Sequence, residues 1–145
     1  MKKIIFFAIA CVVTFNSFAQ NEEQEVKEKP QEYVIVDGAR IYNTKFVDTR
    51  AEFKGGDKAL NKWLIENIRY PISAQERAVQ GKVLVKFIVR KTGEVSDIEL
   101  INKIDYALDK EAIRLVLTMP NWIPAKKNGD TVNTFFTLPI TFVIK

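Results

Sequence analysis

The spacing of hydrophobic and polar residues predicts two helices in the middle of the chain. Apolar residues at helical spacing predict an amphipathic helix from Lys58 to Ile68, with Asp57 as its N-cap. Tyr70-Pro71 ends this helix, because the residue before a proline is pushed out of the helical conformation. Ser73-Ala74-Gln75-Glu76 matches a capping box, so we expect a short second helix that Gly81 closes in a left-handed conformation.

The period then changes to that of strands. Alternation from Lys82 to Lys91 predicts a strand that is covered on one face and partly covered on the other. A turn at Thr92-Gly93-Glu94 leads into a second strand, beginning near Val95, that pairs antiparallel with the first. An apolar stripe at helical spacing predicts a third helix, which Pro120 ends; its members are Leu108, Ala112, Leu115, Val116 and Met119. A final strand is expected from Thr131 to Ile144.

Upstream of these elements, two short β-prone runs, Tyr33–Val36 and Ala39–Tyr42, flank Asp37-Gly38, a dipeptide suited to a tight hairpin turn. Taken together, the elements predict an α+β fold with a small antiparallel three-stranded sheet, helices on one face and an N-terminal β-hairpin. The expected domains are an accessory hairpin over residues 33–46 and a main domain over residues 47–145.

The N-terminal segment has the pattern of an export signal. Lys2 and Lys3 precede an apolar run that closes on Ser17-Phe18-Ala19, which predicts a signal peptide over residues 1–19, cleaved after Ala19 to release a periplasmic protein. Two alternatives stay open: a retained N-terminus that anchors the chain in the membrane, and a lipid-modified Cys11. Residues 20–32 are almost free of apolar side chains and predict a flexible polar tether.

Composition excludes several kinds of chemistry. Histidine is absent, and the single cysteine lies in the expected signal peptide, so imidazole bases, thiolate nucleophiles, disulfides and Cys/His metal sites are not expected. Asp109 and Glu111 lie two residues apart on a helix, where their carboxylates point in different directions and complement the helix start. We therefore expect no enzyme, no metal and no cofactor.

Aromatic and basic residues near the last strand have simple structural interpretations. Trp63 and Trp122 could form an aromatic ligand platform, but anchoring of the core is the favoured interpretation. Lys126-Lys127 before Asn128-Gly129 indicates a solvated loop, since nucleic-acid binding requires a broader basic stripe. Loss of Lys2 and Lys3 with the signal lowers the formal charge from +4 to +2, so no nucleic-acid partner is expected.

An ordered series of landmarks carries a family resemblance over Val47 to Lys145. The series comprises Gly55-Gly56, Tyr70-Pro71, Gly81, Leu108-Asp109-Lys110-Glu111-Ala112, Met119-Pro120-Asn121-Trp122, Asn128-Gly129 and Leu138-Pro139-Ile140-Thr141-Phe142. In order and spacing it resembles a TonB C-terminal domain. The resemblance implies a periplasmic module that binds an extended peptide of an outer-membrane TonB-dependent receptor by strand addition, in support of energy-coupled nutrient transport across the outer membrane.

The implied peptide site combines the turn after the first helix with the last strand. Its residues are Arg69, Tyr70, Pro71, Thr134, Phe136, Leu138, Pro139 and Ile140. Pro139 adds a physical indication, because a proline cannot donate to a ladder and belongs on an edge strand or at a bulge, which implies that the last strand has a free side. A free edge can accept a ligand strand or a second copy of the chain in a homodimer, and a proline there can also serve to prevent aggregation.

Energy transduction is a separate expectation. A retained N-terminus would allow contact with inner-membrane motor proteins, whereas a cleaved one would remove the mechanical link. The second hypothesis is therefore a non-transducing envelope module, soluble or lipid-attached, that scaffolds or regulates a complex.

Overall fold

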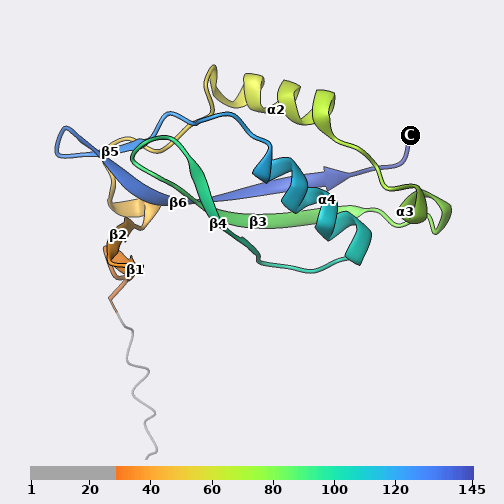
Figure 1. Cartoon of the computed structure of the whole chain (residues 1–145), viewed down its shortest axis with the longest axis horizontal. Helices are drawn as coiled ribbons and strands as arrows, with labels where there is room; N and C mark the ends of the chain where they lie inside the picture. The colour runs from red at the N-terminus through yellow and green to blue at the C-terminus, as the bar shows by residue number, and fades with distance from the viewer. Residues whose placement is uncertain (1–28) are drawn as a thin grey trace, which may run out of the picture.

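The computed structural model describes residues 29–145, so the predicted signal peptide and most of the predicted tether lie outside the described residues. Figure 1 shows a sheet with helices packed against it. The elements in chain order are β1 (Tyr33–Val36), β2 (Ala39–Tyr42), the short 3-10 helix η1 (Thr44–Phe46), α2 (Gly56–Asn67), α3 (Ile72–Glu76), β3 (Gly81–Val89), β4 (Val95–Leu100), α4 (Tyr106–Leu117), β5 (Ala125–Lys127) and β6 (Asp130–Phe142).

The sheet is built around β3. Its strand order is β1-β2-β6-β3-β4, and β5 pairs with β6 beside this path. β3 pairs antiparallel with β6 over its whole length, from Gly81 opposite Phe142 to Val89 opposite Thr134, and antiparallel with β4 on its other side. The predicted three-stranded antiparallel sheet is confirmed. The hairpin extends it, because β2 runs parallel to β6 and pairs with it at Asn133 and Thr134.

The helices cover one face of this sheet, as predicted. The core residues of β3 alternate along the strand and meet those of β6, and α2 contributes Leu60. The predicted stripe on α4 is buried at Leu108, Ala112, Leu115 and Val116, while Met119 is partly buried beyond the helix end. Burying these apolar faces against one another is the main force that holds the helices on the sheet.

Aromatic side chains fill the core beneath α2. The ring of Trp122 lies 4.7 Å from that of Phe136, 5.5 Å from Phe87 and 5.6 Å from Phe53, measured between centroids. Trp122 is 2% exposed. Trp63 is only partly buried and reaches this cluster through Phe53. The interpretation of Trp122 as a core anchor is confirmed.

The hairpin continues the sheet beyond β6. Its Asp37-Gly38 turn has the positive φ angles expected of a tight hairpin. Ile41 is fully buried, and so is Ile88, which lies on the face of β3 turned away from the helices. The outer face of β3 is thus partly covered, as the alternation predicts, and residues of the hairpin line a hollow with Lys86 and Phe135 on this face.

Three local predictions are wrong. The N-cap of α2 is Gly55 in a left-handed conformation, not Asp57, which lies in the first turn of the helix. Ser73 lies inside α3, whose N-cap is Pro71 without a side-chain cap bond, so the capping box does not form. Ala78, not Gly81, takes the left-handed conformation after α3, because Gly81 already begins β3.

One strand was not predicted. Lys126 and Lys127, expected in a solvated loop, form β5 and pair with Thr131 and Asp130 across the Asn128-Gly129 turn. β5 also bonds to the segment before α2, where the main-chain N–H of Lys126 donates to the carbonyl of Thr49 at 2.9 Å.

Candidate peptide-binding edge and groove

The turn that carries Arg69, Tyr70 and Pro71 is fastened to α4. Glu111 accepts a hydrogen bond at 2.8 Å from the main-chain N–H of Arg69 and two bonds at 2.7 Å from the guanidinium of Arg114. The same guanidinium donates to the carbonyl of Asn67 at 2.9 Å. Its hydrogen bonds with Glu111 raise the pKa of Arg114 above the ordinary value. Glu111 therefore holds the turn in place.

Asp109, the second carboxylate on α4, makes a contact of its own with a different segment of the chain. It accepts from the main-chain N–H of Ile104 at 3.2 Å. Because Asp109 and Glu111 bond to different segments, they do not converge on a common point.

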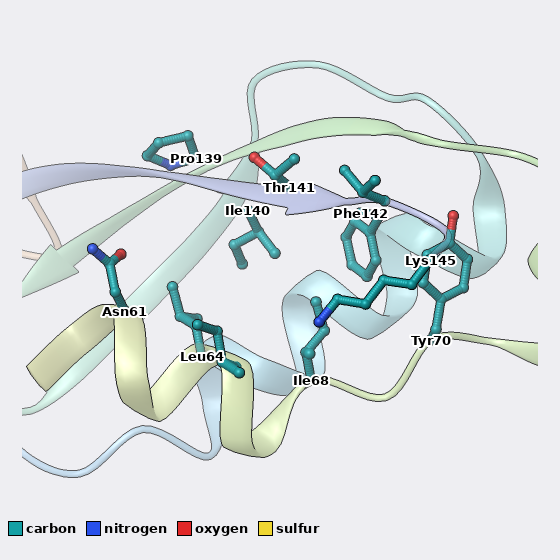
Figure 2. A pocket seen from close by; sticks show the side chains of 11 residues that line it. Asn61, Leu64, Ile68, Tyr70, Pro139, Ile140, Thr141, Phe142 and Lys145 are labelled. Atoms are coloured by element: carbon teal, nitrogen blue, oxygen red, sulfur yellow. The ribbon is translucent and has the colours of Figure 1, made fainter. Parts of the chain in front are cut away.

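Tyr70 connects the turn to the end of the last strand. Its hydroxyl donates to the carbonyl of Val79, and its ring packs edge-on against Phe142 with centroids 5.8 Å apart. Figure 2 shows Tyr70 and Phe142 at one end of a hollow. Tyr70 is thereby fixed at both its ring and its hydroxyl.

Side chains alternate along β6 between the core and the surface. Thr134, Leu138 and Ile140 are buried, and Phe136 packs on the aromatic core. The residues between them, Thr137, Pro139 and Thr141, are exposed. The side chains of the four predicted binding residues Thr134, Phe136, Leu138 and Ile140 thus face inwards.

The main chain of β6 also alternates, and this decides which groups reach its free side. Leu84, opposite Pro139, directs both its N–H and its carbonyl towards the β4 side, where they bond to Asn102 and Ile101. Leu84 and Pro139 therefore form a non-hydrogen-bonded pair, and Pro139 directs its main chain away from β3. Thr137 and Thr141, two residues away on either side, share that direction.

The side of β6 that faces away from β3 is covered at one end only. β2 pairs there with Asn133 and Thr134, and the hydroxyl of Thr44 in η1 donates to the carbonyl of Phe135 at 2.9 Å. Beyond Phe135, no strand of the described chain pairs with this side. We call this stretch, from Thr137 to Thr141, the open edge.

A groove lies between the open edge and α2 (Figure 2). It has a volume of about 520 Å³. Its lining from α2 and the following turn is mainly apolar, and its other wall is the end of β6; the residues are Asn61, Leu64, Ile65, Ile68, Tyr70, Pro139, Ile140, Thr141, Phe142, Val143 and Lys145. Ile65 is 74% exposed, although it is a large apolar side chain. The groove therefore offers apolar contact next to unpaired main-chain groups.

A second hollow, of about 530 Å³, lies on the other side of Tyr70, between α3 and α4. Arg69 and Pro71 line this hollow and do not line the groove, whereas Tyr70 lines both. Of the residues predicted from the sequence, the structure thus brings together Tyr70, Pro139 and Ile140 at the groove. Thr137 and Thr141 of the open edge, and the groove residues of α2, were not predicted.

Neither a metal site nor a membrane span is found in residues 29–145. This part of the chain contains no group of three or more potential metal-binding carboxylates. None of its helices has the length and apolar character needed to cross a membrane.

Comparison with known families identifies the class of this fold. The family model described as the Gram-negative bacterial TonB protein C-terminal matches residues 66–144, so the chain belongs to this family. The match contains the Tyr70 turn and the open edge and leaves out the hairpin and most of α2. TonB C-terminal domains are periplasmic, non-catalytic interaction domains that take part in TonB-dependent transport.

Two solved structures are similar to the chain. Both are NMR solution structures of the Helicobacter pylori TonB-CTD. The one of residues 179–285 is 23% identical, with 59% of this chain and 78% of that chain covered and a TM-score of 0.46. The one of residues 194–285 is 25% identical, with 59% and 90% covered and a TM-score of 0.44. A search of curated proteins found no match.

Proposed function

We propose that this protein binds an extended peptide of an outer-membrane TonB-dependent receptor by strand addition to the open edge of β6. The observation that carries the proposal is the open edge itself, a row of unpaired main-chain groups that ends beside an apolar groove. Strand addition uses such groups for affinity and pockets for alternate side chains for selectivity. Membership of the TonB C-terminal family supplies the class of partner.

The groove gives the ligand a sidedness. An added strand lies about 4.8 Å from β6, and its side chains alternate between the two faces of the sheet. Those on the face shared with Ile140 and Phe142 enter the groove beside Ile65, and those on the other face remain in solvent. A ligand with apolar residues at every second position suits this arrangement.

Pro139 limits the strength of pairing. Its position on the open edge lacks the N–H that any other residue would supply, so an added strand loses one hydrogen bond opposite it. Thr137 and Thr141 keep their donors on either side. The proline therefore moderates pairing with any strand, which accommodates both ligand binding and protection from aggregation.

Titration of the isotope-labelled protein with synthetic peptides from the periplasmic plug end of candidate receptors tests the proposal. Chemical-shift changes are expected at Thr137, Thr141 and Ile65. Thr141→Pro removes one edge donor and should weaken binding by roughly 3- to 10-fold, the value of about one hydrogen bond. Thr141→Val keeps that donor and serves as the matched control. Equal affinities for the two variants, or no shift along β6 at millimolar peptide, would refute the proposal.

A further inference from the structure

An added strand would lie beside β6 on the side that faces away from β3, and we call this position the lane. The hairpin and η1 already occupy one end of it. β2 pairs with Asn133 and Thr134, and Thr44 bonds to the carbonyl of Phe135, so these three consecutive residues are already engaged on the side of the open edge. Two strands cannot share one lane, because neighbouring strands stand about 4.8 Å apart. Figure 1 shows the hairpin at the end of the sheet opposite the C-terminus.

The hairpin is attached by several independent contacts. Ile41 is fully buried, the amide of Asn133 donates to the carbonyl of Arg40 at 3.2 Å, and the hydroxyl of Thr134 donates to the carbonyl of Tyr42 at 3.1 Å. Lys127 adds two more, an ion pair with Glu32 at 2.7 Å and a bond to the carbonyl of Phe46 at 2.7 Å. Such a segment forms a fixed boundary to the open edge.

We propose that this hairpin, with Thr44 at its end, is a stop that limits the length of the ligand strand paired with β6. The inference rests on the proposed function and adds a determinant outside the region matched by the TonB C-terminal family. The lane runs from Phe136 to Val143, which is one residue past the end of β6. At one ligand residue for each residue of the lane, it accepts about eight ligand residues.

The stop acts on one end of the ligand only. The lane is closed at Phe135, and its other end lies at the groove, beside Phe142 and Val143. A ligand that is extended towards Thr44 therefore gains no further contact with β6 once it reaches η1. Pro139 lies within the lane, so whichever ligand residue is opposite it loses one hydrogen bond. The stop therefore favours a ligand with a short paired stretch.

A peptide-length series measured by calorimetry with the full chain tests this. Peptides that bind the wild type are extended residue by residue at either end. Affinity should rise up to about eight paired residues and then remain constant for extension towards Thr44. A series in which affinity keeps rising in both directions overturns the inference.

Ile41→Asp places a charge at a fully buried position of the hairpin and should detach it from β6. Ile41 is not a member of the main core cluster, so that cluster is preserved. In this variant two further edge residues, Asn133 and Phe135, become available, and a twelve-residue peptide should bind roughly 5-fold or more tightly than in the wild type. Ile35→Asp, on the exposed strand of the same hairpin, is the control and should keep the wild-type limit.

The outcomes separate the two proposals. Binding with the same length limit in Ile41→Asp and wild type overturns the stop and leaves strand addition intact. Absence of binding for every peptide overturns both. Thr44→Val is the milder variant, which removes only the hydroxyl bond to Phe135. It should lengthen the paired stretch by about one residue, seen as protection of the Phe135 region from hydrogen exchange on peptide binding.

Discussion

The sheet has two long strands with a free side, and they differ in how that side is treated. β4 is interrupted by a bulge, where its register against β3 shifts between Ile88 and Lys86 and Asp97 takes a positive φ of 52°. The open edge of β6 is continuous and has a single proline. A bulge twists an edge so that other strands do not pair with it, whereas a regular edge remains available.

Polar contacts reinforce the difference. Asp97 accepts bonds from Ser96 at 2.7 Å and from Arg90 at 2.6 Å, which places a charged network on β4. Beside β6 lie the apolar side chains of α2 and the fixed ring of Tyr70. The same sheet therefore protects one edge and leaves the other free next to a groove, which suits the proposed binding through that one edge.

The largest expected effect comes from releasing the turn that closes the groove. Glu111→Ala removes the acceptor for Arg69 N–H and for Arg114, both partly buried. We expect the free energy of unfolding to fall by about 2–3 kcal/mol, because hydrogen bonds to charged groups are lost and polar groups are left unpaired. Urea denaturation measures this.

Glu66→Ala is the control for that measurement, since Glu66 makes only an exposed pair with Lys62 at 3.9 Å. Its unfolding midpoint should stay close to that of the wild type. If Glu111→Ala is equally mild, Glu111 does not hold the turn.

The bulge is tested next. Asp97→Ala keeps a side chain in the left-handed conformation and removes the bonds to Ser96 and Arg90, so we expect a loss of about 1–2 kcal/mol in the free energy of unfolding. Asp97→Gly relieves the backbone strain and should lose less. Thermal unfolding of the pair separates the two contributions, and equal losses would show that the conformation of Asp97 carries no strain.

Pro139→Thr is expected to make the open edge stronger. The variant supplies the missing N–H and should bind a receptor peptide about 5-fold more tightly, the value of roughly one hydrogen bond. It should also self-associate at high concentration, as seen by analytical ultracentrifugation. Glu99→Thr on β4 is the control and should change neither quantity. Unchanged affinity in Pro139→Thr would place the ligand elsewhere.

The sequence was sufficient for most of the fold because its apolar spacing reports burial directly. The stripe of Leu108 to Val116 and the alternation of β3 were interpreted correctly for that reason. The helix ends were harder to predict from the sequence. Gly55 and Ala78 take positive φ angles there, because the chain has to turn at these positions. β5 has only three residues, two of them lysines, and forms because it pairs with both β6 and the segment before α2.

The site was predictable only in part. The last strand as a whole suggested four binding residues: Thr134, Phe136, Leu138 and Ile140. In the alternation of the strand, however, their side chains face the core and their main-chain groups face β3. Pro139 could have indicated the correct residues. A proline has no N–H to donate, so its main chain must face the free side of the strand, and the residues two positions away face the same side. The groove required knowledge of how α2 packs beside β6, and no periodicity reports a contact between such distant segments.

The smallest expected effect is the pH dependence of the protected edge. The hydrogen bond from Ser96, and then the hydrogen bond and the positive charge of Arg90, hold the pKa of Asp97 below its ordinary value of 3.8. Because the folded-state pKa is the lower one, the charged carboxylate stabilises the folded state above about pH 4, and this stabilisation is lost as the pH falls through the folded-state value.

Asp97→Asn keeps a residue that tolerates the left-handed conformation but cannot ionise. Its thermal unfolding midpoint should therefore fall less than that of the wild type between pH 5 and pH 2, where the other carboxylates titrate in both proteins. Added salt should narrow the difference, since the pair with Arg90 is near the surface. Parallel curves for the two proteins would show that the charge on Asp97 does not stabilise the bulge, and protection of the β4 edge would then rest on backbone shape alone.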